Sequence, residues 1–398
     1  MIKKTREDFN KNFQPEFYEN LLNEISQECG EPPAFRVSET PVFINKDLQE
    51  KVFNACDSII DQLWKIDLQK IRNKFIPKNL QSPLPMGRPH FLAIDFGLCE
   101  NENGDITPQL IELQAFPTLF FYQPMLGKAF VKCYPNFNHD DFYYYLSNLD
   151  SESYNEELRK IIIADQSPEN VILMELFPEK QKTRIDFWAT QKALGIPVIC
   201  MTKVIKEGRK LFYEKNGEKI AIHRIYNRVI FDEIEQTPDL KTNFNLNDDV
   251  DVEWVTHPDW FFTISKCIMP LLKSEHIPKS YYLNDFPADL DLKEYVLKPL
   301  FSFAGKGVNL HPTQAIINEI KEKENFILQK KVTYASLIKT PTNKNSKVEL
   351  RILFVWNEEE NRLKPVINLT RMSKGELINV SYQTQETWIG SSISFFEK

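Results

Sequence analysis

The segment from Lys298 to Val308, KPLFSFAGKGV, has the residue types that could hold a phosphate group. Gly305 and Gly307 would let backbone N–H groups approach phosphate oxygens closely, because glycine has no Cβ. Lys298, at the end of a predicted strand, could place its ammonium on the same oxygens. The spacing differs from GxxxxGK[ST], so this segment is not a Walker loop. An ordinary turn between a strand and a helix is the alternative.

Further residues suited to nucleotide chemistry follow in order. FILQKKV, residues 326–332, predicts a strand that runs into a hinge, where one carbonyl and one N–H would suffice to read the adenine edge. Glu349 and Arg351 are two apart, so they share one face of the next predicted strand. Arg351 and Arg371 would neutralise charge on a transferring phosphoryl group, because a guanidinium fork fits phosphate. A surface salt bridge is the alternative for either arginine.

Oxygen donors occur much earlier in the chain, on two predicted strands. Asp95 lies in HFLAIDFGLCE, and Glu112 and Gln114 lie in PQLIELQAF. Glu112 and Gln114 are two apart and so share a face. Oxygen ligands on adjacent strands suit a magnesium ion that bridges phosphates. The alternative is that these are polar residues at strand edges.

The first part of the chain predicts helices and then a hairpin. Residues 46–75 repeat apolar side chains at helical spacing, and a proline-rich breaker follows at 77–89. The strands at 90–100 and 108–116 enclose an Asn-Gly pair, which favours a hairpin turn. The aromatic-rich stretch 119–149 is interpreted as helical.

The rest of the chain predicts alternating strands and helices. Strand 170–176, helix 183–195 and strand 196–202 predict a right-handed parallel unit. A hairpin turned at Asn216-Gly217 follows. Later segments predict four more strands and one helix, at 294–300, 313–324, 326–332, 348–356 and 364–373.

Composition excludes several classes of function. The net charge of −7 argues against a general nucleic-acid binder, which needs a basic surface. The six cysteines form no CxxC pair, and the six histidines form no zinc-binding spacing. The charged start lacks a signal-peptide core, and no apolar run is long enough to span a membrane. We therefore expect a cytoplasmic protein, with its oligomeric state open, a homodimer included.

The order of these motifs resembles the ATP-grasp fold. Residues 257–398 contain the lysine, loop, hinge and arginines in the order of that family, and Lys266 stands where the family often has an earlier phosphate-binding lysine. The pair of strands that usually carries the magnesium ligands lies upstream instead, at Asp95 and Glu112-x-Gln114. This layout is similar to circularly permuted ATP-grasp proteins, namely eukaryotic glutathione synthetase and the synthetase half of glutathionylspermidine synthase.

The resemblance implies a mixed α/β fold, circularly permuted, with an inserted Rossmann-like pre-ATP-grasp domain. Its four parts would be an N-terminal helical region at 1–85, the permuted strands at 86–150, the Rossmann-like substrate domain at 165–257 and the ATP-grasp domain at 258–398.

The resemblance also implies roles for individual residues. ATP would be bound by Lys266, Lys298, Ser302, Gly305, Lys306, Gly307, Gln329, Lys330 and Val332. Magnesium would be held by Asp95, Glu112 and Gln114. Arg351, Arg371 and Lys298 would be catalytic, and substrate would contact Arg228, Arg224 and Asn379. Two positions depart from the family, since Gln114 replaces its asparagine and Ser302 replaces a metal-binding glutamate.

The implied activity is an ATP- and Mg²⁺-dependent ligation of a carboxylate and an amine through an acyl phosphate. The expected partners are these two small molecules, with no nucleic acid and no membrane. The two departures keep open a nucleotide-binding protein without ligase turnover. A small-molecule phosphotransferase of the same fold is a further alternative.

Overall fold

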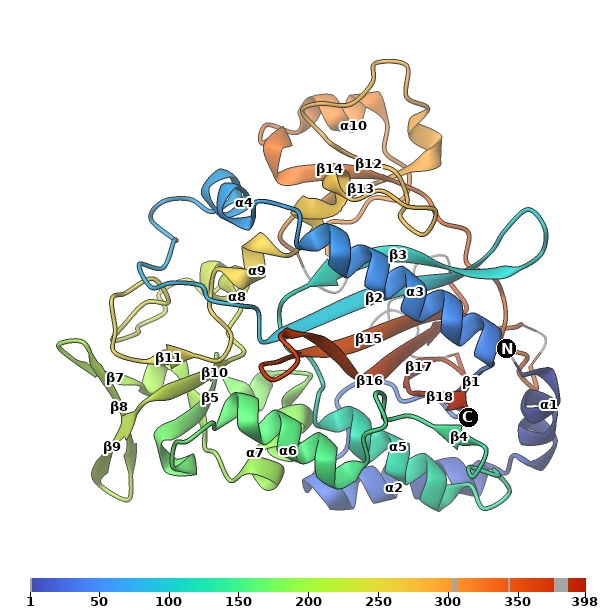
Figure 1. Ribbon diagram of the computed structural model, residues 1–398, viewed down its shortest axis with the longest axis horizontal. Coiled ribbons are helices and arrows are strands. Elements are labelled where there is room, and N and C mark those ends of the chain that lie inside the picture. Colours follow the sequence, from blue (N-terminus) through green and yellow to red (C-terminus); the bar gives the residue numbers. More distant parts are fainter. Residues whose placement is uncertain (1, 303–305, 343, 376–385) are drawn as a thin grey trace.

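A twisted five-stranded antiparallel sheet forms the centre of the molecule (Figure 1). The computed structural model describes residues 2–302, 306–342, 344–375 and 386–398. The two outer parts of the chain build the central sheet together, in the order β17 (Gly390–Ser392), β16 (Arg362–Ser373), β15 (Lys347–Asn357), β2 (Phe91–Glu100) and β3 (Ile106–Gln114). The predicted β2–β3 hairpin is thereby confirmed, and strands far apart in sequence pair along β2 and β15.

Both faces of the central sheet are covered, which is why β2 reads as an almost continuous apolar run. Helix α3 (Lys46–Leu63) packs against β3 on one face, and α5 (Tyr122–Cys133) packs against β16 on the other. Side chains alternate between the two cores: Leu92 and Ile94 enter the first, and Phe91 and Ala93 enter the second. The central sheet therefore contributes to a hydrophobic core on each of its faces.

A second, parallel sheet occupies the middle of the chain. Its order is β11 (Glu253–Trp254), β10 (Arg224–Asn227), β5 (Val171–Glu175) and β6 (Val198–Cys200). All three pairings are parallel, and α7 (Arg184–Leu194) connects β5 to β6. The parallel strand–helix–strand unit is thus confirmed, whereas the pre-ATP-grasp assignment of this region stays a prediction.

Two smaller antiparallel sheets flank these units. One consists of β12 (Ser280–Tyr282), β14 (Phe326–Lys330) and β13 (Tyr295–Pro299), which α10 (Gln314–Glu319) covers at the top of Figure 1. The other consists of β7 (Ile205–Glu207), β8 (Lys210–Lys215) and β9 (Glu218–Ile222). Asn216 and Gly217 both have positive φ, of 54° and 84°, as a tight hairpin turn requires.

The two ends of the chain meet in a third small sheet. Strand β18 (Ser394–Glu397) pairs in parallel with β1 (Val42–Ile44) and antiparallel with β4 (Phe142–Tyr143). The remaining helices are α1 (Lys3–Asn12), α2 (Pro15–Cys29), α4 (Leu68–Phe75), α6 (Ser151–Ile162), α8 (Phe231–Glu235) and α9 (Trp260–Thr263).

The sequence interpretation of residues 119–149 is wrong in part. Helix α5 ends at Cys133, and the aromatic stretch beyond it forms β4 and irregular backbone. Ser147 and Asn148 have positive φ, which breaks any helix there. Helix α6 then begins where no helix is predicted, with Asp150 and Ser153 capping its first turn through reciprocal hydrogen bonds.

Candidate active site

One face of the central sheet changes from apolar to charged along its strands. Asp95 lies directly opposite Glu112 on β3 and directly opposite Arg351 on β15, so the three side chains share this face. Glu349 lies opposite Arg371 of β16 on the same face. The register that buries Ala93 and Leu353 further along the face therefore also gathers five charged groups.

Asp95 is the centre of this charged cluster, and its side chain is only 1% exposed. Arg351 donates to both carboxylate oxygens, from Nε to Oδ1 and from Nη2 to Oδ2 at 2.5 Å. Arg371 donates to Oδ2 at 2.6 Å. Two guanidinium groups on one buried carboxylate form a rigid, charge-assisted arrangement.

The same nitrogen of Arg371, Nη2, also lies 3.0 Å from Glu349 Oε2. Tyr334 donates its hydroxyl to the other oxygen of Glu349 at 2.6 Å. Burial raises the pKa of the Glu349 carboxyl, while Arg371 acts in the opposite direction. The tyrosine ring also lies over Gly97, where a Cβ would come within 2.7 Å of the ring edge. Tyr334 is a site residue that sequence reasoning missed, because no motif marks it.

Two lysines approach the cluster from outside the central sheet. Lys266, at the start of the 3₁₀ turn Lys266–Leu271, donates to the carbonyl of Ser302 at 2.7 Å and lies 3.5 Å from Glu112. Lys298, on β13, donates to the carbonyl of Ile111 at 3.1 Å. Burial lowers the pKa of the Lys298 ammonium to about 8, against the effect of Glu112.

Glu112 is the carboxylate that these cations share. Arg351 Nη2 lies 3.7 Å from one of its oxygens and Lys266 Nζ lies 3.5 Å from the other. Burial opposes its ionisation, yet the surrounding cations, Lys266 first, lower its pKa to about 2. The Glu112 side chain is 23% exposed, so Glu112 is more accessible than Asp95, which lies opposite it.

A narrow cavity lies beside Glu112, lined also by Gln114, Lys266 and Ser302 and walled by aromatic rings. Its volume of about 20 Å³ admits roughly one water-sized species. The hydroxyl of Ser302 is buried there without a hydrogen-bond partner among the described residues. Four residues predicted for ATP or metal binding thus lie at one cavity.

The donor set does not fit a magnesium ion held by Asp95, Glu112 and Gln114. Both oxygens of Asp95 accept hydrogen bonds from arginines, and each oxygen of Glu112 faces a cation within 3.7 Å. Magnesium needs short oxygen contacts in near-octahedral geometry. Within the described ranges, no cluster of three Asp, Glu, His or Cys residues could hold a metal. The magnesium prediction therefore finds no support in this geometry.

The predicted phosphate loop reaches the middle region of the chain. Lys306 donates to the side chain of Gln236, just after α8, at 2.6 Å. Gly307 has φ of 75°, and a Cβ there would come within 3.0 Å of the Pro299 ring, so only glycine fits without displacement. Gly305 lies outside the described residues, and its phosphate role stays a prediction.

The predicted adenine hinge follows the end of β14. Gln329 is buried, and its amide donates to the carbonyl of Leu110 at 3.0 Å, which ties this strand to β3. Lys330 ends the strand with an exposed side chain, and Val332 lies two residues beyond it. The predicted hinge segment thus follows a strand that is bonded to β3, and its adenine role stays a prediction.

The residues predicted to bind substrate are buried and paired in the middle region. Arg224 donates to the carbonyls of Ile161 and Ile162 and pairs with Glu253. Arg228 donates to Asp186 at 2.6 Å, with the two side chains 4% and 0% exposed. Their substrate roles stay predictions. Asn379 falls outside the described residues.

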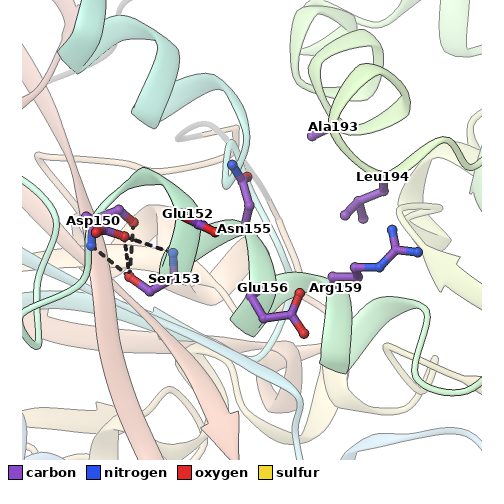
Figure 2. Close-up of a pocket in the computed structure, with 8 residues that line it drawn as sticks. All are labelled: Asp150, Glu152, Ser153, Asn155, Glu156, Arg159, Ala193 and Leu194. Atoms are coloured by element: carbon purple, nitrogen blue, oxygen red, sulfur yellow. Dashed lines mark hydrogen bonds between the residues drawn. The ribbon is translucent and has the colours of Figure 1, made fainter.

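A separate surface hollow lies between α6 and α7 (Figure 2). The capping residues Asp150 and Ser153 bond to each other at one end, and Arg159 lies near Leu194 at the other. None of the predicted site residues lines it. Asp150 and Ser153 cap the start of α6, and we assign no ligand to this hollow.

The central sheet, the charged face and the flanking α/β units together define a glutathione synthetase-like fold. Among solved structures, the chain is similar to a glutathione synthetase-like effector, GSS30, from Globodera pallida, determined in its apo form. The TM-score is 0.58 with 11% identity, over 97% of this chain and 98% of that one. The predicted resemblance to eukaryotic glutathione synthetase is thereby confirmed at the level of the fold.

Comparisons of sequence add no closer relative. No protein-family model matches the chain, and no curated protein matches it. Across the described residues, helices long and apolar enough to cross a bilayer are absent. All six cysteines carry free thiols.

Proposed function

We propose that this protein is an ATP-dependent ligase that joins a carboxylate to an amine through an acyl phosphate. The observation that carries the proposal is the convergence of Lys266, Lys298, Arg351 and Arg371 around Glu112, on a glutathione synthetase-like fold. Four cations around one accessible carboxylate suit a polyanionic chain of phosphates. We further propose that the reaction takes place in the cytoplasm, where the free thiols would stay reduced.

The proposed reaction needs no covalent bond to the protein. A carboxylate oxygen of the acid attacks the γ-phosphorus of ATP, and the bond from that phosphorus to the ADP oxygen breaks. The amine nitrogen then attacks the acyl carbon, phosphate leaves, and the nitrogen loses a proton. The chain's own contribution is to hold the phosphates and to neutralise their charge with fixed cations, which costs no reorganisation during the reaction.

Individual cations would act at different points. Lys266 and Lys298 would hold the phosphates, since each ammonium is already fixed by a backbone carbonyl. Arg371 would stabilise the transferring phosphoryl group, because its side chain is 23% exposed while Asp95 and Glu349 hold the guanidinium in place. The segment around Lys330 and Val332 would bind adenine.

The proposal is tested by supplying ATP with pooled amino acids, dicarboxylates and polyamines and measuring ADP release. Mass spectrometry then identifies the product. We expect an amide, whose mass equals the acid plus the amine minus water. The variant Lys298→Met should abolish ADP release. Lys293→Met should not, because Lys293 is exposed and lies in the short turn just before β13. A phosphate ester as the product would instead identify a phosphotransferase.

A nucleotide-binding protein without ligase turnover is the second candidate. This candidate is favoured by the two arginines that donate to the carboxylate oxygens of Asp95. It is also favoured by Ser302, whose hydroxyl stands where the family has a carboxylate. ATP binding without substrate-stimulated ADP release across the whole panel would establish this candidate and refute the ligase.

A further inference from the structure

Arg351 occupies the position between the two carboxylates that sequence reasoning assigned to a metal ion. Its Nε and Nη2 atoms bind both oxygens of Asp95, and Nη2 lies 3.7 Å from Glu112 Oε1. Asp95 and Glu112 are directly opposite each other on adjacent strands, and Arg351 is directly opposite Asp95 on the next strand. One guanidinium group therefore faces both carboxylates.

The cluster already has an excess of positive charge without an added ion. Within the part of the chain that the structure describes, three carboxylates face four cations: Asp95, Glu112 and Glu349 against Lys266, Lys298, Arg351 and Arg371. A divalent ion beside Glu112 would meet Lys266 on one side and Arg351 on the other. Like charges at such distances repel strongly in a buried setting.

We propose that Arg351 stands in for a divalent cation, so that this site binds the polyphosphate chain of a nucleotide without a metal ion. The inference rests on the proposed function only in that polyphosphate binds here. It concerns how the phosphate charge is neutralised, and it holds whether or not ligation follows.

A guanidinium is chemically suited to this replacement. It carries a permanent charge and five donors in a planar fork, and two of its nitrogens are already fixed by Asp95. Its 8% exposed side chain loses little further freedom when phosphate arrives. Ser302 Oγ, buried beside Glu112 and without a hydrogen-bond partner among the described residues, supplies a neutral donor for the same oxygens.

Calorimetry of ATP and of inorganic tripolyphosphate, in EDTA and in excess magnesium, tests the inference on the full-length chain. We expect the dissociation constants in the two conditions to differ by less than about tenfold. Binding that appears only with magnesium would overturn the inference. ADP release is measured separately, so loss of turnover with retained metal-free binding would refute the ligase alone.

The variant Arg351→Met reverses the arrangement. Without this guanidinium, Asp95 Oδ1 and Glu112 Oε1 lose their cation, whereas Arg371 stays on Asp95 Oδ2 and Lys266 stays near Glu112 Oε2. Polyphosphate binding should therefore become metal-dependent, and Mn²⁺ binding, followed by electron paramagnetic resonance, should appear. Arg362→Met is the matched control, because Arg362 lies at the exposed end of β16, paired with Glu360. Unchanged metal independence in Arg351→Met would contradict the role of Arg351.

A second variant keeps the inference testable if Arg351→Met does not fold. Glu112→Gln removes one negative charge without changing the shape of the side chain. If Glu112 repels phosphate in a metal-free site, the variant should bind tripolyphosphate in EDTA more tightly than the wild type. If Glu112 instead holds a metal, the variant should lose magnesium-supported affinity, and the inference would fail.

Discussion

Two of the buried aspartate–arginine clusters in the described part of the chain differ in stoichiometry. In the central sheet, Asp95 is shared by Arg351 and Arg371, and further cations surround its neighbour Glu112. In the middle region, Arg228 is the one described side chain that pairs with Asp186, and the second oxygen of Asp186 accepts from the backbone N–H groups of residues 121 and 122 at 2.8 and 3.0 Å.

The two clusters also differ in exposure and in net charge. The Asp186 cluster is sealed, at 0% and 4% exposure, and its carboxylate caps the start of α5, so it joins the parallel sheet to the helix that covers the central sheet. The Asp95 cluster has an excess of positive charge and opens at Glu112 and Arg371, which are each 23% exposed. Excess charge with access is what an anionic ligand requires.

The largest effect is expected from Asp186→Ala. Removing this carboxylate leaves Arg228 buried without its partner and two N–H groups at the start of α5 without an acceptor. The loss should be about 3–5 kcal/mol of unfolding free energy. Urea unfolding measures it, with Asp251→Ala as the control, because the Asp251–Arg209 pair is half-exposed and should contribute less than about 1 kcal/mol. Equal losses in both variants would contradict the distinction.

Lys298→Met should weaken nucleotide binding by about a hundredfold, or about 2.7 kcal/mol, because it removes one buried phosphate-facing charge. Its stability should change little or improve, since methionine avoids the cost of burying an ammonium. Calorimetry with ATP measures the affinity, and Lys293→Met serves as the exposed control. Unchanged affinity in Lys298→Met would remove this lysine from the site.

A pH titration should separate affinity from stability at the same lysine. The folded-state pKa of about 8 lies below the ordinary 10.5. As pH rises through about 8, the ammonium loses its proton and nucleotide affinity should fall, by at most about tenfold per pH unit. Between these two pKa values the unfolded chain holds more protons at Lys298, so the unfolding free energy of the wild type relative to Lys298→Met should rise with pH. Burial raises the pKa of thiols and phenols such as Cys56 and Tyr334, which contribute the opposite slope equally in both proteins. A stability difference between the two proteins that falls with pH would refute the assignment.

Tyr334→Phe should give the smallest effect. It removes one hydrogen bond to Glu349 and should cost about 1 kcal/mol of stability. Tyr213→Phe, which removes a hydrogen bond to the carbonyl of Glu169, should cost a similar amount. Only Tyr334→Phe should also weaken ATP binding, because Glu349 holds Arg371. If both variants bind ATP as the wild type does, Tyr334 has no positioning role.

Local patterns predicted local elements well. The Asn-Gly pairs marked both hairpins, and strands β5 and β6 with α7 between them were recognisable from periodicity and length. The aromatic run after α5 could not be assigned by periodicity, because its rings extend from irregular backbone and pack against Phe395 of β18. Helix α6 had a readable signal in Asp150 and Ser153, which its polar composition concealed.

The residues of the candidate site were found, but not their pairing. Asp95 and Arg351 are 256 positions apart, and only the register of β2 with β15 makes them neighbours. A shift of one residue would move either side chain to the opposite face. The sequence contains no local sign of that register. The contact of Arg351 with Asp95 and its approach to Glu112 therefore became visible only in three dimensions.

The pairing of β2 with β15 also has a consequence for synthesis on the ribosome. Strand β2 emerges long before its partner, so for most of translation its edge and the carboxylate of Asp95 lack their final neighbours. An unpaired apolar strand edge is prone to associate with other chains. Chaperone occupancy of nascent chains should therefore persist until β15 has left the exit tunnel, and the anion site forms only then.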